Sequence, residues 1–194
     1  FDVIKQQFDG LNFSFEETNY KNISNLIISN GDSKDKTFCF LGHTDVVPPG
    51  PESEWTVPPF SGVIIGNKIY GRGTADMKGG VACFISALKE FLLEYKEPSF
   101  NIMVLLNSNE EGKLENGKVD RVINEMIDKD KFIDFCLIGE PSSSKKIGDV
   151  IRIGRRGSLS GNLKVFGVQG HVAYPKQALN PILGIGKTLE ELKN

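Results

Sequence analysis

Short apolar runs alternate with amphipathic segments along the first 140 residues of the chain. Three runs rich in β-branched and aromatic residues, at 37–41, 100–106 and 132–138, are typical of buried strands. Between them, the apolar positions of 81–92 and 119–127 recur at the spacing of one helix face. This order of strands and helices predicts crossover connections. We therefore expect an α/β fold with a mostly parallel sheet sandwiched by helices.

The pattern changes near residue 157. Before that point, 13–15 and 26–28 are further strand candidates, and 63–65 and 68–70 predict a hairpin around Gly66-Asn67. After it, apolar and polar residues alternate over 158–166, as in a half-exposed antiparallel strand, and a helical pattern over 182–192 follows. We therefore expect one domain over 1–156 and the start of a smaller α+β domain over 157–194.

Composition narrows the class of protein. The chain is 194 residues long with a net charge of −2, which favours neither a nucleic-acid surface nor an acidic tail. No apolar run is long enough to cross a membrane, so we expect no membrane partner. Cys39, Cys83 and Cys136 each lie in an apolar segment and predict buried, reduced thiols in a cytoplasmic protein. Both ends interrupt helical patterns, so we expect an internal fragment of a longer protein.

Acidic residues and a histidine follow the ends of the predicted strands. Each is weak alone: His43 is as consistent with a structural histidine as with a ligand, and adjacent glutamates are usually a solvated pair. Gathered at one rim, however, the carboxylates would repel one another, and cations would remove that repulsion. Nitrogen and carboxylate ligands suit zinc, with cobalt or manganese possible, and predict a two-metal hydrolytic site. The residues concerned are His43, Asp45, Asp76, Glu110, Glu111 and Glu140.

Four motifs carry a resemblance to a known family. The segments 42–48 (GHTDVVP), 71–79 (GRGTADMKG), 109–111 (NEE) and 139–142 (GEPS) resemble those of the M20 metallopeptidases in order and spacing. Segments 154–159 and 167–175 are similar to the branch of that family that hydrolyses N-succinyl-L,L-2,6-diaminopimelate. The resemblance implies a zinc-exopeptidase-like catalytic domain, a second (lid) domain that forms a homodimer, and this small molecule as the substrate.

The resemblance also implies roles for single residues. His43 would bind one zinc ion with Glu140, Glu111 would bind a second, and Asp76 would bridge the two. Glu110 would be the general base, and Asp45 would orient His43. His171 would reach across a dimer to stabilise the oxyanion, although a structural strand-end histidine is the alternative. The substrate-contact candidates are Arg155, Ser158 and Tyr174; a salt bridge at the domain hinge is as plausible for Arg155. A cis peptide bond after Asp76 is also implied.

One departure from the family limits these expectations. The family's second metal takes a histidine near the end of its full-length chain, and this sequence has only two histidines, His43 and His171. We therefore expect the 194-residue chain alone to be inactive or nearly so. The alternatives are another M20 deacylase such as acetylornithine deacetylase, a di-zinc aminopeptidase or carboxypeptidase, and a non-catalytic M20-like binding or dimerisation protein.

Overall fold

The structure of the chain is a computed structural model, and it describes residues 1–31, 34–112, 119–154, 157 and 159–193. The chain divides into two compact units, Phe1–Ile151 and Arg152–Asn194, each of which is described by itself. The first unit contains the sheet. None of the described helices is long and apolar enough to cross a membrane.

A five-stranded sheet with the order β1-β2-β6-β3-β7 forms the first unit. Strand β3 pairs in parallel with both β6 and β7, whereas β2 pairs antiparallel with β6 and with β1. The α/β class is confirmed, and the sheet is mixed. A short turn at 21–22 can join β1 and β2 only as an antiparallel pair, while long connections that include a helix allow the parallel pairs. The strands are β1 Ser14–Tyr20, β2 Ile23–Ser29, β3 Thr37–His43, β6 Asn101–Asn107 and β7 Phe135–Ile138.

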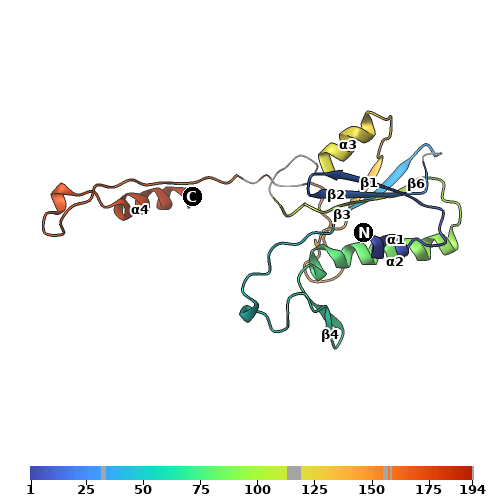
Figure 1. Ribbon diagram of the computed structural model, residues 1–194, viewed down its shortest axis with the longest axis horizontal. Coiled ribbons are helices and arrows are strands. Elements are labelled where there is room, and N and C mark those ends of the chain that lie inside the picture. The colour runs from blue at the N-terminus through green and yellow to red at the C-terminus, as the bar shows by residue number, and fades with distance from the viewer. Residues whose placement is uncertain (32–33, 113–118, 155–156, 158, 194) are drawn as a thin grey trace. The chain divides into compact units, whose positions relative to one another are not determined.

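Helices cover both faces of this sheet (Figure 1). Helices α1 (Asp2–Gln6) and α2 (Gly79–Glu94) lie on one face, and α3 (Val119–Ile127) lies on the other. Because side chains alternate along a strand, each strand contributes to both cores. In β3, for example, Phe40 belongs to the core under α2, together with Val81 and Ile85, whereas Cys39 belongs to the core under α3, together with Val122.

The predicted burial of the cysteines is wrong at two of three positions. Cys39 is buried, but Cys83 and Cys136 are exposed. Cys83 lies on the outer face of α2, although apolar residues surround it in sequence. Cys136 lies on β7, which is an edge strand of the sheet and exposes all four of its residues. An apolar neighbourhood in sequence therefore did not decide burial here.

Three further elements of the first unit lie outside the five-stranded sheet and the helices that cover it. The predicted hairpin is present as β4 (Val63–Ile65) and β5 (Lys68–Tyr70), which form a separate two-stranded sheet. Between β3 and β4 lies a long loop that includes the short 3₁₀ helix Glu52–Glu54. The segment Thr74–Lys78 is a kinked turn that leads into α2, because Asp76 and Met77 have non-helical backbone angles.

The second unit has fewer paired elements than predicted. Helix α4 (Pro181–Leu192) is present, and the side chain of Asn180 caps it by accepting a hydrogen bond from the Ile182 N–H at 3.0 Å. The predicted strand over 158–166 is wrong: residue 158 lies outside the described residues, and 159–166 are not assigned to a strand. In this unit the described residues form a single antiparallel bridge, Val168 with Leu179, and a 3₁₀ helix, Pro175–Gln177. Alternation alone does not make a strand when no neighbouring strand supplies its hydrogen bonds.

Candidate metal centre

The predicted acidic residues of the first unit come together at one edge of the sheet. His43 ends β3, Glu110 and Glu111 follow β6, and Glu140 follows β7. These three strands are adjacent and parallel, so their carboxyl ends share one rim. Asp76 reaches the same rim from the kinked turn before α2.

His43 is the centre of this cluster. Its side chain is only 2% exposed, and its Nε2 lies 3.0 Å from Oδ1 of Asp76 and 3.5 Å from Oε1 of Glu140. Its Nδ1 lies 3.1 Å from the backbone oxygen of Asp45. Among the described residues, two groups offer ligand atoms that lie within 4.8 Å of one another: His43 with Glu110 and Glu140, and His43 with Asp76 and Glu111.

Asp45 connects this histidine to the glutamates. Its carboxylate accepts hydrogen bonds from the backbone N–H groups of Glu110 and Glu111, each at 3.0 Å. The same carboxylate lies 3.4 Å from Nδ1 of His43. The sequence suggested only the contact with His43. The structure shows that Asp45 also holds the segment that follows β6 beside the end of β3.

The electrostatics of the cluster suit a bound cation. Burial raises the pKa of Glu140, and the nearby Asp76 raises it further. Burial and then Asp76 likewise raise the pKa of Glu111. Burial acts to lower the pKa of His43, but the charge of Glu140 and the contacts with Asp45 and Asp76 outweigh it and raise that pKa. A divalent cation would relieve the repulsion among the carboxylates, and this mixture of nitrogen and oxygen ligands is one that zinc accepts.

Met77 belongs to the site, and sequence reasoning missed it. The peptide bond between Asp76 and Met77 is cis, as the family resemblance implied. The Met77 side chain is fully buried, and its sulfur accepts a hydrogen bond from the backbone N–H of His43 at 3.2 Å. A Cβ on Gly139 would lie 2.7 Å from the Met77 methyl carbon, so the residue before Glu140 must be small. Nothing local in the sequence distinguishes Met77 from an ordinary core methionine.

The other predicted site residues belong to the second unit, and two of them lie outside the described residues. Arg155 and Ser158 are not among the described residues. His171 and Tyr174 are exposed residues of the second unit, with their ring centroids 5.7 Å apart. Nδ1 of His171 accepts a hydrogen bond from the N–H of Ala173 at 3.1 Å. Within the first unit, the structure brings the candidate ligands together.

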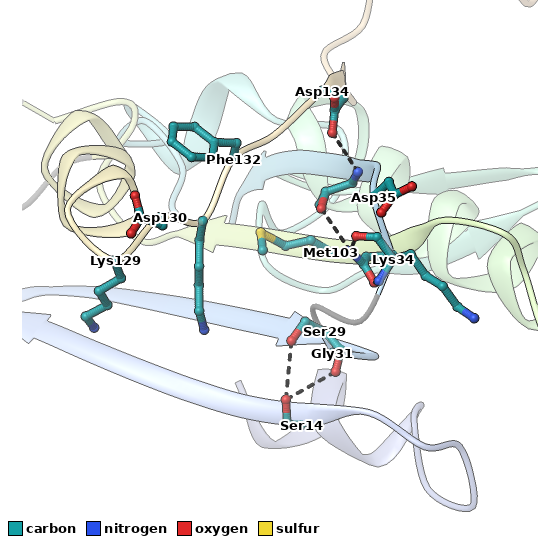
Figure 2. Close-up of a pocket in the computed structure, with 13 residues that line it drawn as sticks. Ser14, Ser29, Gly31, Lys34, Asp35, Met103, Lys129, Asp130, Phe132 and Asp134 are labelled. Atoms are coloured by element: carbon teal, nitrogen blue, oxygen red, sulfur yellow. Dashed lines mark hydrogen bonds between the residues drawn. The ribbon is translucent and has the colours of Figure 1, made fainter.

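Two cavities of the first unit differ in whether they adjoin the rim of strand ends. One, of about 990 Å³, lies along α1 and α2 and is also lined by Thr44, Lys78 and Ser108, which lie near the rim. The other, of about 680 Å³, lies at the opposite end of the sheet, where Ser14 and Ser29 are hydrogen-bonded (Figure 2). Of these two cavities, the first adjoins the rim that carries the candidate ligands.

Known proteins are similar to this chain in sequence and in fold. The sequence description of Peptidase family M20/M25/M40 matches residues 39–186. Succinyl-diaminopimelate desuccinylases from Alkalilimnicola ehrlichii and Methylococcus capsulatus are 44% and 46% identical to 98% of this chain. The chain spans about half (50%) of the length of these curated relatives.

Solved structures add the fold. An M20 family metallo-carboxypeptidase from Sulfolobus solfataricus has a TM-score of 0.58 and 26% identity, over 73% of this chain and 31% of that protein. Human carnosine dipeptidase 1 also has a TM-score of 0.58, at 23% identity, over 71% of this chain and 31% of its own. The strand-end cluster, the match over residues 39–186 and these neighbours agree: the chain belongs to peptidase family M20/M25/M40.

Proposed function

We propose that the full-length protein containing this chain is a zinc-dependent amidohydrolase. It would cleave the amide bond of N-succinyl-L,L-2,6-diaminopimelate to give succinate and L,L-diaminopimelate, a step of lysine and diaminopimelate biosynthesis. The observation that carries the proposal is the pair of ligand groups that share His43. The substrate follows from the names of relatives that are 44–46% identical to nearly the whole chain.

Each residue of the cluster has a role in this proposal. His43 and Glu140 would hold one zinc ion, Glu111 would hold the second, and Asp76 would bridge them. Bound zinc supplies polarisation of the substrate carbonyl and lowers the pKa of water at the site; cobalt or manganese accepts the same ligands. Glu110 takes a proton from the attacking water and passes it to the departing amine.

The assignments of Glu110 and Glu111 need to be separated by experiment, because each belongs to one of the two ligand groups. Asp45 accepts a hydrogen bond from the backbone N–H of each glutamate, so its contacts do not distinguish the roles of the two side chains. A general base can be removed without loss of metal, whereas a ligand cannot. In the full-length protein, we expect Glu110→Gln to keep two zinc ions and lower kcat by roughly 10²–10⁴-fold. We expect Glu111→Gln to lose one zinc ion.

The second unit supplies the remaining parts of the proposal. Residues 157–194 begin a domain through which two copies associate, and His171 of one copy stabilises the oxyanion in the site of the other. Arg155, Ser158 and Tyr174 contact the substrate, since a guanidinium matches a carboxylate in shape and charge. The reaction takes place in the cytoplasm. Equilibrium sedimentation of the full-length protein tests the dimer, and His171→Ala should lower kcat while leaving the dimer intact.

Substrate comparison tests the function itself. The full-length protein, loaded with zinc, is assayed with N-succinyl-L,L-diaminopimelate and with acetylornithine. A clear preference in kcat/KM for the succinyl substrate supports the proposal, whereas a preference for acetylornithine would assign the protein to another M20 deacylase. Binding of two metals with turnover of neither substrate would favour a non-catalytic binding protein. We expect no measurable turnover from the 194-residue chain alone.

A further inference from the structure

A long proline-rich loop beside the metal ligands has no role in the function proposed above. It runs over 46–61, between β3 and β4, and contains Trp55, the single tryptophan of the chain (Figure 1). The loop begins directly after Asp45. Trp55 is half-buried, and its indole N–H donates a hydrogen bond to the backbone oxygen of Pro49 at 2.9 Å.

The segment just before the turn that carries Asp76 contacts this loop through Arg72. The guanidinium carbon of Arg72 lies 5.0 Å from the centroid of the Trp55 ring, within the range of a cation–π interaction. The backbone N–H of Arg72 donates to the oxygen of Pro59 at 2.6 Å. Nε of Arg72 is buried and has no hydrogen-bond partner among the described residues. The guanidinium of Arg72 thus has the Trp55 ring as a neighbour on its face, while its Nε makes no hydrogen bond to the described residues.

The backbone of the turn also fits closely against the start of the loop. Gly73 has a φ of +84°, which an L side chain adopts at a cost, and a Cβ there would lie 2.5 Å from Cγ1 of Val46. The oxygen of Gly73 accepts a hydrogen bond from the N–H of Lys78 at 2.9 Å, which closes the turn around Asp76. The two residues before the turn thus meet the loop near both of its ends: Gly73 lies close to Val46, and Arg72 is hydrogen-bonded to Pro59.

These contacts affect the distance between Asp76 and His43, two candidate metal ligands. Asp76 Oδ1 lies 3.0 Å from Nε2 of His43, and His43 is on β3 while Asp76 is on the turn. The loop joins the end of β3 to the hairpin that precedes the turn, so its docking on Arg72 helps to set the separation of the two ligands. Residues that hold a ligand in place commonly influence metal affinity by 10–100-fold.

We propose that Arg72 and Trp55 are positioning residues that hold Asp76 beside His43, so that Trp55 fluorescence reports on metal binding there. The inference rests on the metal centre of the proposed function, and it concerns residues that are not themselves ligands. Neither side chain is assigned any contact with substrate or metal.

The test uses zinc titrations of the 194-residue chain, followed in parallel by calorimetry and by the emission of Trp55. We expect zinc to shift the emission with a midpoint equal to the calorimetric Kd. Trp55→Ala and Arg72→Met should each weaken zinc binding by about tenfold. Trp55→Phe, which keeps an aromatic face for Arg72, should recover most of that affinity. The matched control is Phe60→Ala in the same loop, because Phe60 is 66% exposed; its Kd should be unchanged.

Far-UV circular dichroism shows whether each variant remains folded, and Asp76→Asn should abolish the emission change while the chain stays folded. If zinc binds by calorimetry but the emission is unchanged and the Trp55→Ala and Arg72→Met affinities stay within twofold of the parent, the positioning role is wrong and the metal centre stands. If the parent chain binds no zinc by calorimetry, the same titrations are made on the full-length protein, and the proposed metal centre and this inference fail together if that protein also binds none.

Discussion

Replacing Asp45 with asparagine should loosen the metal centre without removing a metal ligand. The Asp45 carboxylate is 19% exposed and accepts two backbone hydrogen bonds, from Glu110 and Glu111, each at 3.0 Å. Asparagine keeps one acceptor oxygen and places an NH₂ group against the other N–H. One charged hydrogen bond is therefore lost and the other becomes neutral.

The magnitude follows from these two bonds. A hydrogen bond to a charged group contributes about 1.5–3 kcal/mol and a neutral one about 1 kcal/mol, so Asp45→Asn should lower the free energy of unfolding by about 2–5 kcal/mol. With a urea m-value of about 2 kcal/mol/M, the midpoint should fall by about 1–2.5 M. Because the Glu111 backbone is released, zinc affinity should also fall by roughly 10–100-fold.

Urea unfolding followed by circular dichroism, and zinc calorimetry, measure both effects on the 194-residue chain. The matched control is Asp9→Asn, which removes an exposed carboxylate that is distant in sequence from the residues of the rim. Its free energy of unfolding should stay within about 0.5 kcal/mol of the parent value. If Asp45→Asn has the midpoint and the zinc Kd of Asp9→Asn, Asp45 does not hold the Glu110–Glu111 segment, and the reasoning is refuted.

Three other predictions test the site and the fold. Zinc at 100 times its Kd should stabilise the chain by about 2.7 kcal/mol at pH 7. The stabilisation should be smaller at pH 5, because burial raises the pKa of Glu111 and Glu140 and protons then compete with the metal. Thermal melts with and without zinc at both pH values measure this difference. Gly139→Ala should lower the free energy of unfolding, measured with urea, by about 1–3 kcal/mol, because its Cβ would lie 2.5 Å from the Phe40 ring. The control Gly186→Ala in α4 should not lower it, because a Cβ there would meet no atom of the described residues within 4 Å beyond its chain neighbours and its own helix backbone. A hydrogen bond from Lys36, then one from the Thr37 N–H, lowers the pKa of Asp134, so the folded state favours the carboxylate. The destabilisation by Asp134→Asn should therefore be complete above the unfolded pKa of about 3.9 and disappear as pH falls through the lower folded pKa, which urea midpoints at pH 7 and pH 2 will show.

Local sequence was sufficient to predict most elements and the convergence of the candidate ligands at one rim. The strands that became β3, β6 and β7 and the helices α2 and α3 follow from hydrophobic periodicity, which neighbouring residues determine. Once adjacent strands are parallel, their carboxyl ends must share a rim. His43, Glu110 and Glu140 could therefore be predicted to meet without knowledge of any other contact.

Tertiary structure decided which side chains support those ligands and which residues are exposed. The sulfur of Met77 beneath His43, the Asp45 carboxylate on two backbone N–H groups and the stacking of Arg72 on Trp55 all join segments distant in sequence or depend on the path of a loop. The same limit explains the errors, because the exposure of Cys136 depends on its edge strand and pairing over 159–166 depends on a neighbouring strand. The periodicity of a segment is a property of that segment, whereas burial, pairing and ligand support belong to the packed chain.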